Sequence, residues 1–478
     1  MILLGDKMSE NKIKFILSLF QGELEKYSND DEYKAYLYEK INKAYKIELE
    51  KGIEEETFIE MIKKEIPHFI DEYDRLKENV SLISSEQNTM IGTSINFELI
   101  DLFKISKGCN NNEEFIMARD SYFKQLSLDP RFQPIEKFIF PGLSDITLYE
   151  IRNIEENLVK NVDCITPEWA GKMRACIDIT KPLIVDGKIN EEIFNFELLD
   201  KTANFARQNG MSMRVHNIIW HKDFRPIFEN ATNEEILMFL DVYTKKIYER
   251  YGDIIYSVDV LNEIVSDNPD EILRESSWKD KLGDEYYIEV LRITKKNFGN
   301  IPLFYNEYGE ERELKRNHIL KIINKIKEVE KQEGITLLDG IGIQSHYSNQ
   351  TSDNDIKRAY MDYAKTGKKL QITEFDVSRP KNEVSDFDYQ TNRVFRTVLD
   401  CATSCKIQLM NLWGISSKIS WLNKEKSTGE CLLDENGNIT MYSNKLIEAY
   451  SNKKKCSKQL NEMIQNQKNS DLNKGILK

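Results

Sequence analysis

The sequence has few of the residues that build metal centres and cross-links. Seven cysteines are scattered over 478 residues, no two of them form a CxxC pair, and there are only five histidines. Structural zinc sites need cysteines and histidines at short, fixed intervals, so this spacing argues against one. An odd number of scattered cysteines is typical of free thiols in a reducing compartment.

Long apolar runs and an excess of basic residues are also missing. The N-terminal segments MILLG and FILSLF are too short for the apolar part of a secretory signal. No run approaches the roughly 20 apolar residues of a membrane span. The formal net charge of -13 argues against a nucleic-acid or anionic-membrane partner, because neutralising phosphates takes clustered lysine and arginine. We therefore expect a cytoplasmic protein.

The length of the chain indicates more than one structural unit, because 478 residues exceed what one core usually supports. Residues 9 to about 80 are dense in lysine and glutamate, with apolar residues at helical spacing. We predict a mainly helical N-terminal region over residues 1–135, whose role the sequence does not reveal. A larger domain then covers 136–452, and a polar tail typical of disorder covers 453–478.

From about Lys137 onward, short β-branched runs alternate with amphipathic stretches. The runs begin at 163, 213, 257, 303, 340, 370 and 409, six intervals that average 41 residues. A (β/α)8 barrel implies roughly 25 to 50 residues per unit, so the pattern predicts an α/β fold of this type, a TIM barrel. We take KFIFPG, at 137–142, as its first strand. MIGTSI, at 90–95, is a rival that would leave some 70 residues before the next strand.

Two of the intervening helices carry recognisable end signals. One stretch runs from Asn190 to Gly210, where the glycine is typical of the position just after a helix. Another opens with Thr232 and Glu235, which fit a capping box, and runs to Gly252.

Side chains suited to sugar binding and acid–base chemistry gather where these strand-like runs end. A single carboxylate at a strand end is weak evidence for a functional site, because the chain is acidic and the dipeptide Asn-Glu occurs seven times. The rare residue types are stronger evidence, because three of the five histidines (His216, His221 and His346) and four of the five tryptophans fall in these segments. Indoles stack on sugar rings, while amides and carboxylates bond hydroxyl groups, so this mixture favours a sugar site.

Two glutamates stand out because each follows an apolar run. Glu263 ends VDVLNE and Glu374 lies in QITEFD, 111 residues further on. Strands four and seven of an eight-stranded barrel face each other across its mouth, where active sites of this fold lie. Two facing carboxyl groups are what hydrolysis of a glycosidic bond requires, and a separation of roughly 5 Å gives retention of configuration.

These segments resemble the family-10 glycoside hydrolases, the endo-1,4-β-xylanase family, over about residues 137–450. The segments that carry the resemblance follow the family order: TPEWAGK, RVHNIIWH, VDVLNE, YNEY, QSH, TEFD and WGISSKISW. Each motif is weak alone, but the set in register is specific. The resemblance implies a retaining glycosidase that cleaves β-1,4-xylosidic bonds in xylan or xylo-oligosaccharides and needs neither a metal nor another cofactor.

The resemblance also implies roles for individual residues. Glu263 would be the general acid/base and Glu374 the nucleophile. Asn262 would bond the 2-hydroxyl of the sugar, and His346, oriented by Asp376, would bond the nucleophile. The other residues implied to hold or wall the substrate are Glu168, Lys172, His216, Trp220, Gln344, Trp413 and Trp421.

The reaction centre keeps the family pattern, whereas the distal subsite departs from it. Trp169 stands where the family has an asparagine that contacts the next sugar outward, and Val258 replaces a tryptophan. Val215 replaces a glycine and Ser417 an aspartate. The exact glycan is therefore open, and a barrel glycosidase acting on another β-linked glycan is the alternative. Two further alternatives are a carbohydrate-binding barrel without catalysis and a partner-binding protein dominated by residues 1–135.

Overall fold

The computed structural model describes most of the chain from residue 89 onward. The described residues are 56–64, 66–67, 89–129, 142–380, 386–423, 427–434 and 436–440, with the single positions 37, 41, 45, 132, 443 and 446. Of the predicted N-terminal helices, residues 56–64 are helical, and Phe58 and Ile62 in this helix are buried. The predicted tail over 453–478 lies outside the described residues.

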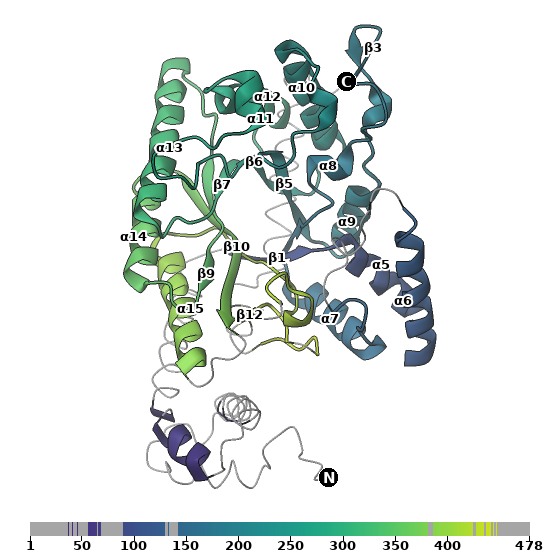
Figure 1. Ribbon diagram of the computed structural model, residues 1–478, viewed down its shortest axis with the longest axis vertical. Helices are drawn as coiled ribbons and strands as arrows, with labels where there is room; N and C mark the ends of the chain where they lie inside the picture. The colour runs from purple at the N-terminus through teal and green to yellow at the C-terminus, as the bar shows by residue number, and fades with distance from the viewer. Residues whose placement is uncertain are drawn as a thin grey trace.

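Eight parallel strands close into a barrel, with helices around it (Figure 1). The strands are β1 (Met90–Ile95), β2 (Cys164–Pro167), β5 (Ser212–Trp220), β6 (Ile255–Asn262), β7 (Leu303–Glu307), β8 (Gly340–Ile343), β10 (Lys369–Pro380) and β11 (Leu409–Leu412). Closure comes from β1, which pairs with β2 on one side and with β11 on the other. The TIM-barrel prediction is therefore confirmed.

The first barrel strand is the rival MIGTSI and not KFIFPG. Met90 pairs with Leu409 and Gly92 with Cys164, so β1 fills the place between the last strand and β2. Except for Gly142, the segment 137–142 lies outside the described residues. The choice of KFIFPG, and with it a barrel that starts at 136, was wrong because two extra helices, α5 (Phe97–Lys107) and α6 (Asn112–Leu126), lengthen the first β/α unit.

The other helices follow the expected alternation. They are α7 (Leu148–Asn161), α8 (Met173–Cys176), α9 (Glu197–Gln208), α10 (Asn233–Tyr251), α11 (Ser277–Leu282), α12 (Tyr286–Phe298), α13 (Glu313–Glu333), α14 (Asp353–Ala364) and α15 (Asp386–Ser404). The predicted end signals are present: Gly210 has a positive φ of 65° just after α9, and Thr232 and Glu235 form a capping box on α10. None of the described helices combines the length and apolar character that crossing a bilayer requires.

Short pieces of strand and 3-10 helix decorate the barrel. β9 (His346–Ser348) and β12 (Ser427–Glu430) pair with the long β10 beyond the barrel wall, and β3 (Ile184–Val185) pairs with β4 (Lys188–Ile189). The 3-10 turns are η4 (Glu191–Ile193), η5 (Pro226–Phe228) and η6 (Ser417–Ile419).

The barrel strands are buried on both faces, as expected for parallel strands covered by helices. Every residue of β1, β2, β7, β8 and β11 is buried. Close packing inside the barrel requires glycine at several strand positions, among them Gly342 in β8. A Cβ atom at Gly342 would lie 2.6 Å from the Oδ1 atom of Asn306 and 2.9 Å from the Cγ2 atom of Thr373.

Candidate active site

One asparagine, Asn306 at the end of β7, forms hydrogen bonds with both predicted glutamates. Its Nδ2 atom donates to the Oε1 atom of Glu374 at 2.7 Å and to the Oδ1 atom of Asn262 at 2.8 Å. Its backbone carbonyl accepts from the N–H group of Glu263 at 3.0 Å. Thr373 donates to its Oδ1 atom at 2.6 Å and so fixes which way the amide points. Asn306 therefore holds both glutamate segments in one frame.

Glu374 is a buried carboxylate between two imidazoles. The Nε2 atom of His346 lies 3.2 Å from one carboxylate oxygen, and the Nδ1 atom of His216 lies 3.9 Å from the other. Burial alone would raise the pKa of Glu374. The charge of His216, the charge and hydrogen bond of His346 and the amide of Asn306 outweigh burial and lower this pKa to about 2. Glu374 is therefore ionised at neutral pH, as the nucleophile role requires.

His346 is held in turn by Asp376. Its Nδ1 atom forms an ion pair with Asp376 at 2.9 Å, and Trp421 donates its indole N–H to the same carboxylate at 2.8 Å. Burial would lower the pKa of His346, but the carboxylates of Asp376 and Glu374 together raise it well above its ordinary value. The imidazole is thus charged, and it lies between the two acidic groups as predicted.

Glu263 follows β6 in a left-handed backbone conformation, with φ at 55°. Such a conformation costs a non-glycine residue roughly 1–3 kcal/mol and is found mainly at functional sites. The side chain accepts from the indole N–H of Trp220 at 2.7 Å and from the Nε2 atom of Gln344 at 3.2 Å. The Nδ1 atom of His221 lies 3.7 Å away. In contrast to Glu374, the two hydrogen-bond donors of Glu263 are neutral groups.

The remaining predicted residues line the same edge of the barrel. Lys172 places its Nζ atom 4.5 Å from the centre of the Trp220 ring. His216 forms an ion pair with Asp259 at 2.9 Å beneath the site. Burial raises the pKa of Glu168 to about 7, against the opposing charge of Lys172 and a hydrogen bond from Asn96.

The two tryptophans after β11 differ in exposure. Trp413 is 6% exposed and lies edge-on to His216, with ring centres 5.4 Å apart. Trp421 is 37% exposed, so part of its side chain is accessible from outside the protein. The structure thus brings all twelve predicted side chains to one end of the barrel, although Trp413 has little free surface.

The departures from the family pattern have clear places. Trp169 packs with Phe97 and Phe132, at ring-centre distances of 6.3 and 5.6 Å, in a small aromatic cluster beside β1. Val258 is fully buried in β6. Trp169 therefore lacks the amide group that the family has at its position, and Val258 lacks the indole that the family has at its own.

Sequence reasoning missed several residues that hold Glu263 and Glu374. Asn306 lay in the quoted segment YNEY but was given no role there. Arg274, in the loop after β6, donates to the carbonyl of Glu263 at 3.1 Å and to the hydroxyl of Tyr308 at 2.9 Å. No spacing or motif in the sequence points to Arg274, since its contact is made with a backbone atom.

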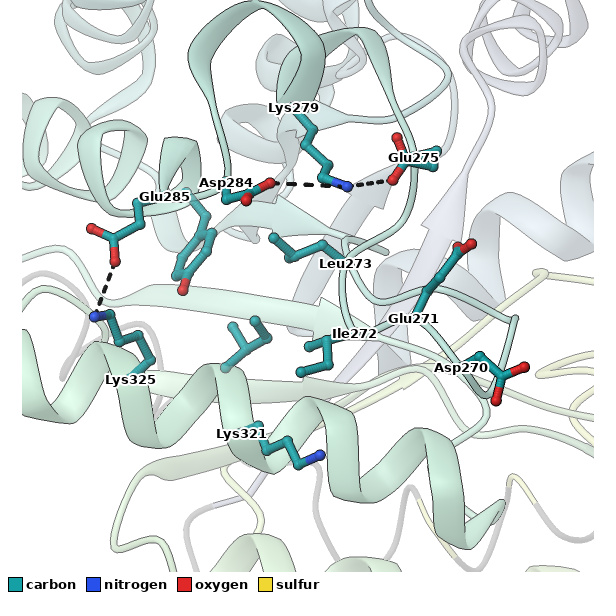
Figure 2. A pocket seen from close by; sticks show the side chains of 12 residues that line it. Asp270, Glu271, Ile272, Leu273, Glu275, Lys279, Asp284, Glu285, Lys321 and Lys325 are labelled. Carbon is teal, nitrogen blue, oxygen red and sulfur yellow. Dashed lines mark hydrogen bonds and ion pairs between the residues drawn. The ribbon is translucent and has the colours of Figure 1, made fainter.

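A hollow of about 580 Å³ lies elsewhere, between the loop after β6 and helices α12 and α13 (Figure 2). Lysines such as Lys321 and Lys325 and carboxylates such as Asp270 and Glu285 line it, and none of the predicted site residues does. Among the described residues, no three His, Cys, Asp or Glu side chains are grouped as a metal site requires.

Comparisons with known proteins show the family to which the chain belongs. Residues 141–449 match the family model described as glycosyl hydrolase family 10. The chain is 30% identical over 321 residues to endo-1,4-beta-xylanase A of Caldicellulosiruptor saccharolyticus, covering 61% of this chain and 88% of the relative. The structure resembles the endo-1,4-beta-xylanase of Caldicellulosiruptor owensensis, with a TM-score of 0.55, 25% identity and coverage of 78% of this chain and 98% of the other. A further match, with a TM-score of 0.56, 25% identity and coverage of 77% and 98%, is a mutant structure in complex with xylotriose.

Proposed function

Because the chain belongs to glycosyl hydrolase family 10, we propose that it hydrolyses β-1,4-xylosidic bonds in xylan or xylo-oligosaccharides with retention of configuration. The observation that carries this proposal is the contrast between two glutamates joined by Asn306. Glu374 is kept ionised between two imidazoles, while Glu263 is held by an indole and an amide. A double displacement needs this combination of an ionised nucleophile and a separate proton donor.

In the first step, a carboxylate oxygen of Glu374 attacks the anomeric carbon. Glu263, protonated at this stage, gives its proton to the departing glycosidic oxygen, and a glycosyl ester on Glu374 remains. In the second step, Glu263 takes a proton from water, and the oxygen of that water displaces Glu374 from the anomeric carbon. The hydrogen bond from Asn306 and the charge of His346 disperse the negative charge on Glu374 when it leaves.

The substrate assignment is supported by the relatives rather than by the site alone. The curated relative is named an endo-1,4-beta-xylanase, and one similar structure holds xylotriose. We propose short β-1,4-xylo-oligosaccharides as substrates in the cytoplasm. Fractionation of the native cells would check this location, since recovery of the protein in the medium would contradict it.

Incubation of xylohexaose with wild type, Glu263→Gln and Glu374→Gln tests the reaction. We expect short xylo-oligosaccharides from wild type and a loss of several orders of magnitude in both variants. Glu249→Gln is the matched control, because Glu249 is an exposed glutamate on α10 whose ion pair with Lys245 is long, at 3.8 Å. Full activity of either site variant would refute the proposal.

An aryl β-xyloside with a good leaving group separates the two roles. Such a substrate needs no acid in the first step, so Glu263→Gln should still form the glycosyl ester and should release phenol in a burst. Glu374→Gln should form no ester at all, which mass spectrometry of the intact protein would show. A burst of phenol from Glu374→Gln would mean that the acid/base and nucleophile roles of the two glutamates are the reverse of those proposed.

The alternative is a family member whose glycan is not xylan. It is favoured by Trp169, whose indole packs with Phe97 and Phe132 where the family pattern has an amide. A panel of aryl β-xylosides, β-glucosides and β-galactosides decides between them. Activity on the glucoside or galactoside without activity on the xyloside would replace the xylan proposal with this one.

A further inference from the structure

Trp220, the residue that donates its indole N–H to Glu263, is surrounded by positive charge. The Nζ atoms of Lys172 and Lys222 lie 4.5 and 4.9 Å from its ring centre, and the guanidinium carbon of Arg174 lies at 5.6 Å. These cations come from two separate segments, the one after β2 and the one after β5. In a chain with a formal charge of -13, this is a local reversal of sign.

Few carboxylates balance this cluster. Asp223 is fully buried and forms an ion pair with Arg174, which also donates to the backbone carbonyl of Lys222. Within the described part of the chain, neither lysine of the cluster has a carboxylate at ion-pair distance. Glu168 also faces Lys172, and burial raises its pKa to about 7, so it supplies only part of a charge at neutral pH. The carboxylate of Glu263 lies at the edge of the same indole, 2.7 Å from its N–H group.

A fourth cation, Arg225, adjoins the cluster. Burial, and then the charge of Arg174, lower the pKa of Arg225. The Nε atom of Arg225 is buried and has no hydrogen-bond partner among the described residues. The cluster of Lys172, Arg174, Lys222 and Arg225 therefore includes a buried donor that no described protein group satisfies.

Attraction to the indole alone does not explain this arrangement. A cation over a tryptophan ring gains from its quadrupole. The two ammonium groups, however, share one ring, and so lie closer together than the Debye length of about 10 Å at 0.1 M salt, within which like charges repel. A bound anion between the two ammonium groups would remove this repulsion.

We propose that this cluster binds the carboxylate of an acidic sugar, so that the preferred substrates are xylo-oligosaccharides carrying a uronic acid. This inference rests on the function proposed above. The link to the reaction is direct: Trp220 bonds Glu263 at 2.7 Å, so an anion held beside the indole lies next to the reaction centre. Oxyanions such as phosphate share the chemistry, but a substituent on the sugar chain is delivered there by substrate binding itself.

The test compares xylo-oligosaccharides of equal length that carry one glucuronic acid, one neutral arabinose or no branch. We expect wild type to have a higher kcat/KM on the acidic substrate than on the two neutral ones. The ratio of acidic to unbranched kcat/KM should fall by about fivefold in Lys222→Gln and further in Lys222→Glu. Lys321→Gln, on the outer hollow of Figure 2, is the matched control and should keep the wild-type ratio.

Salt and phosphate give independent readouts. Raising the ionic strength from about 20 to about 500 mM should reduce the ratio of acidic to unbranched kcat/KM in wild type, because salt screens the attraction of the cluster for the acidic substrate only. Inorganic phosphate should inhibit turnover of the acidic substrate and not of the unbranched one. If phosphate inhibits both equally, the cluster is a general anion site and the uronic-acid assignment is overturned.

The outcomes separate the two proposals. Two results would overturn this inference and leave the proposed function standing. In the first, wild type cleaves the unbranched substrate, but its ratio of acidic to unbranched kcat/KM is one or below. In the second, Lys222→Gln does not change this ratio. Absence of turnover on all three substrates overturns both.

Discussion

The charge of His346 is expected to set the acid limit of the reaction. The pKa of Glu374 is lowered from 4.5 to about 2, which at 1.36 kcal/mol per pH unit favours the ionised form by about 3 kcal/mol. Glu374 is almost fully buried, so solvent screening removes little of this effect. Burial acts in the opposite direction, and hence the two imidazoles and the Asn306 amide supply more than this amount.

The variant His346→Gln keeps an N–H donor of similar reach but removes the charge. A depressed pKa means that the carboxylate of wild type loses its charge only as the pH falls towards about 2. Without the imidazolium, burial is less well opposed and the pKa of Glu374 should rise. We expect the acidic limb of the kcat/KM profile to move upward by about one to two pH units, the range expected when one nearby opposite charge is lost.

The assay is the pH dependence of kcat/KM for unbranched xylotetraose, because this parameter reports ionisations of the free enzyme. His318→Gln, at a histidine on α13 outside the site, controls for loss of a buried imidazole. If the acidic limb of His346→Gln coincides with that of wild type, the charge of His346 does not hold Glu374 ionised, and the electrostatic account of the site is wrong.

Three further predictions address the frame of the site. Gly342→Ala would place a methyl group 2.6 Å from the Oδ1 atom of Asn306, and we expect kcat to fall about 10²-fold with the circular dichroism spectrum intact; normal turnover would show that the asparagine can move freely. Arg214→Met should leave the buried Asp259 short of its guanidinium partner and lower the free energy of unfolding by about 3–5 kcal/mol, measured by urea denaturation; an unchanged midpoint would contradict this. Trp421→Phe keeps the ring but removes the N–H group that bonds a buried carboxylate, so kcat/KM on xylotetraose should fall about tenfold, and an equal loss in Trp421→Ala would mean that the ring itself contributes nothing.

Much of the fold could be predicted from the sequence because the local signals were consistent. Seven of the eight barrel strands follow short β-branched runs at regular intervals, and the ends of α9 and α10 carry the expected glycine and capping box. The first strand was placed at KFIFPG instead of its rival MIGTSI, because the extra helices α5 and α6 lengthen the interval between β1 and β2. A regular interval is good evidence only where each unit has the usual length.

The residues of the site could be selected from the sequence, but the hydrogen bonds between them could not. Glu263 and Glu374 were selected because each follows an apolar run, and His346 because three of the five histidines fall at strand ends. Asn306 was seen at a strand end but received no role, and its importance lies in three hydrogen bonds to residues far away in the chain. The lowered pKa of Glu374 depends on distances between side chains from different strands, which a sequence does not contain.

The double pairing of β1 has a consequence for anyone who wishes to express the catalytic part alone. Thr89 bonds the carbonyl of Ile407, and Met90 bonds that of Gln408, so the segment joins the two ends of the sheet. A fragment starting at residue 136 would leave β2 and β11 with open edges, and such edges recruit strands from other molecules and aggregate. A truncated protein should therefore begin upstream of Thr89.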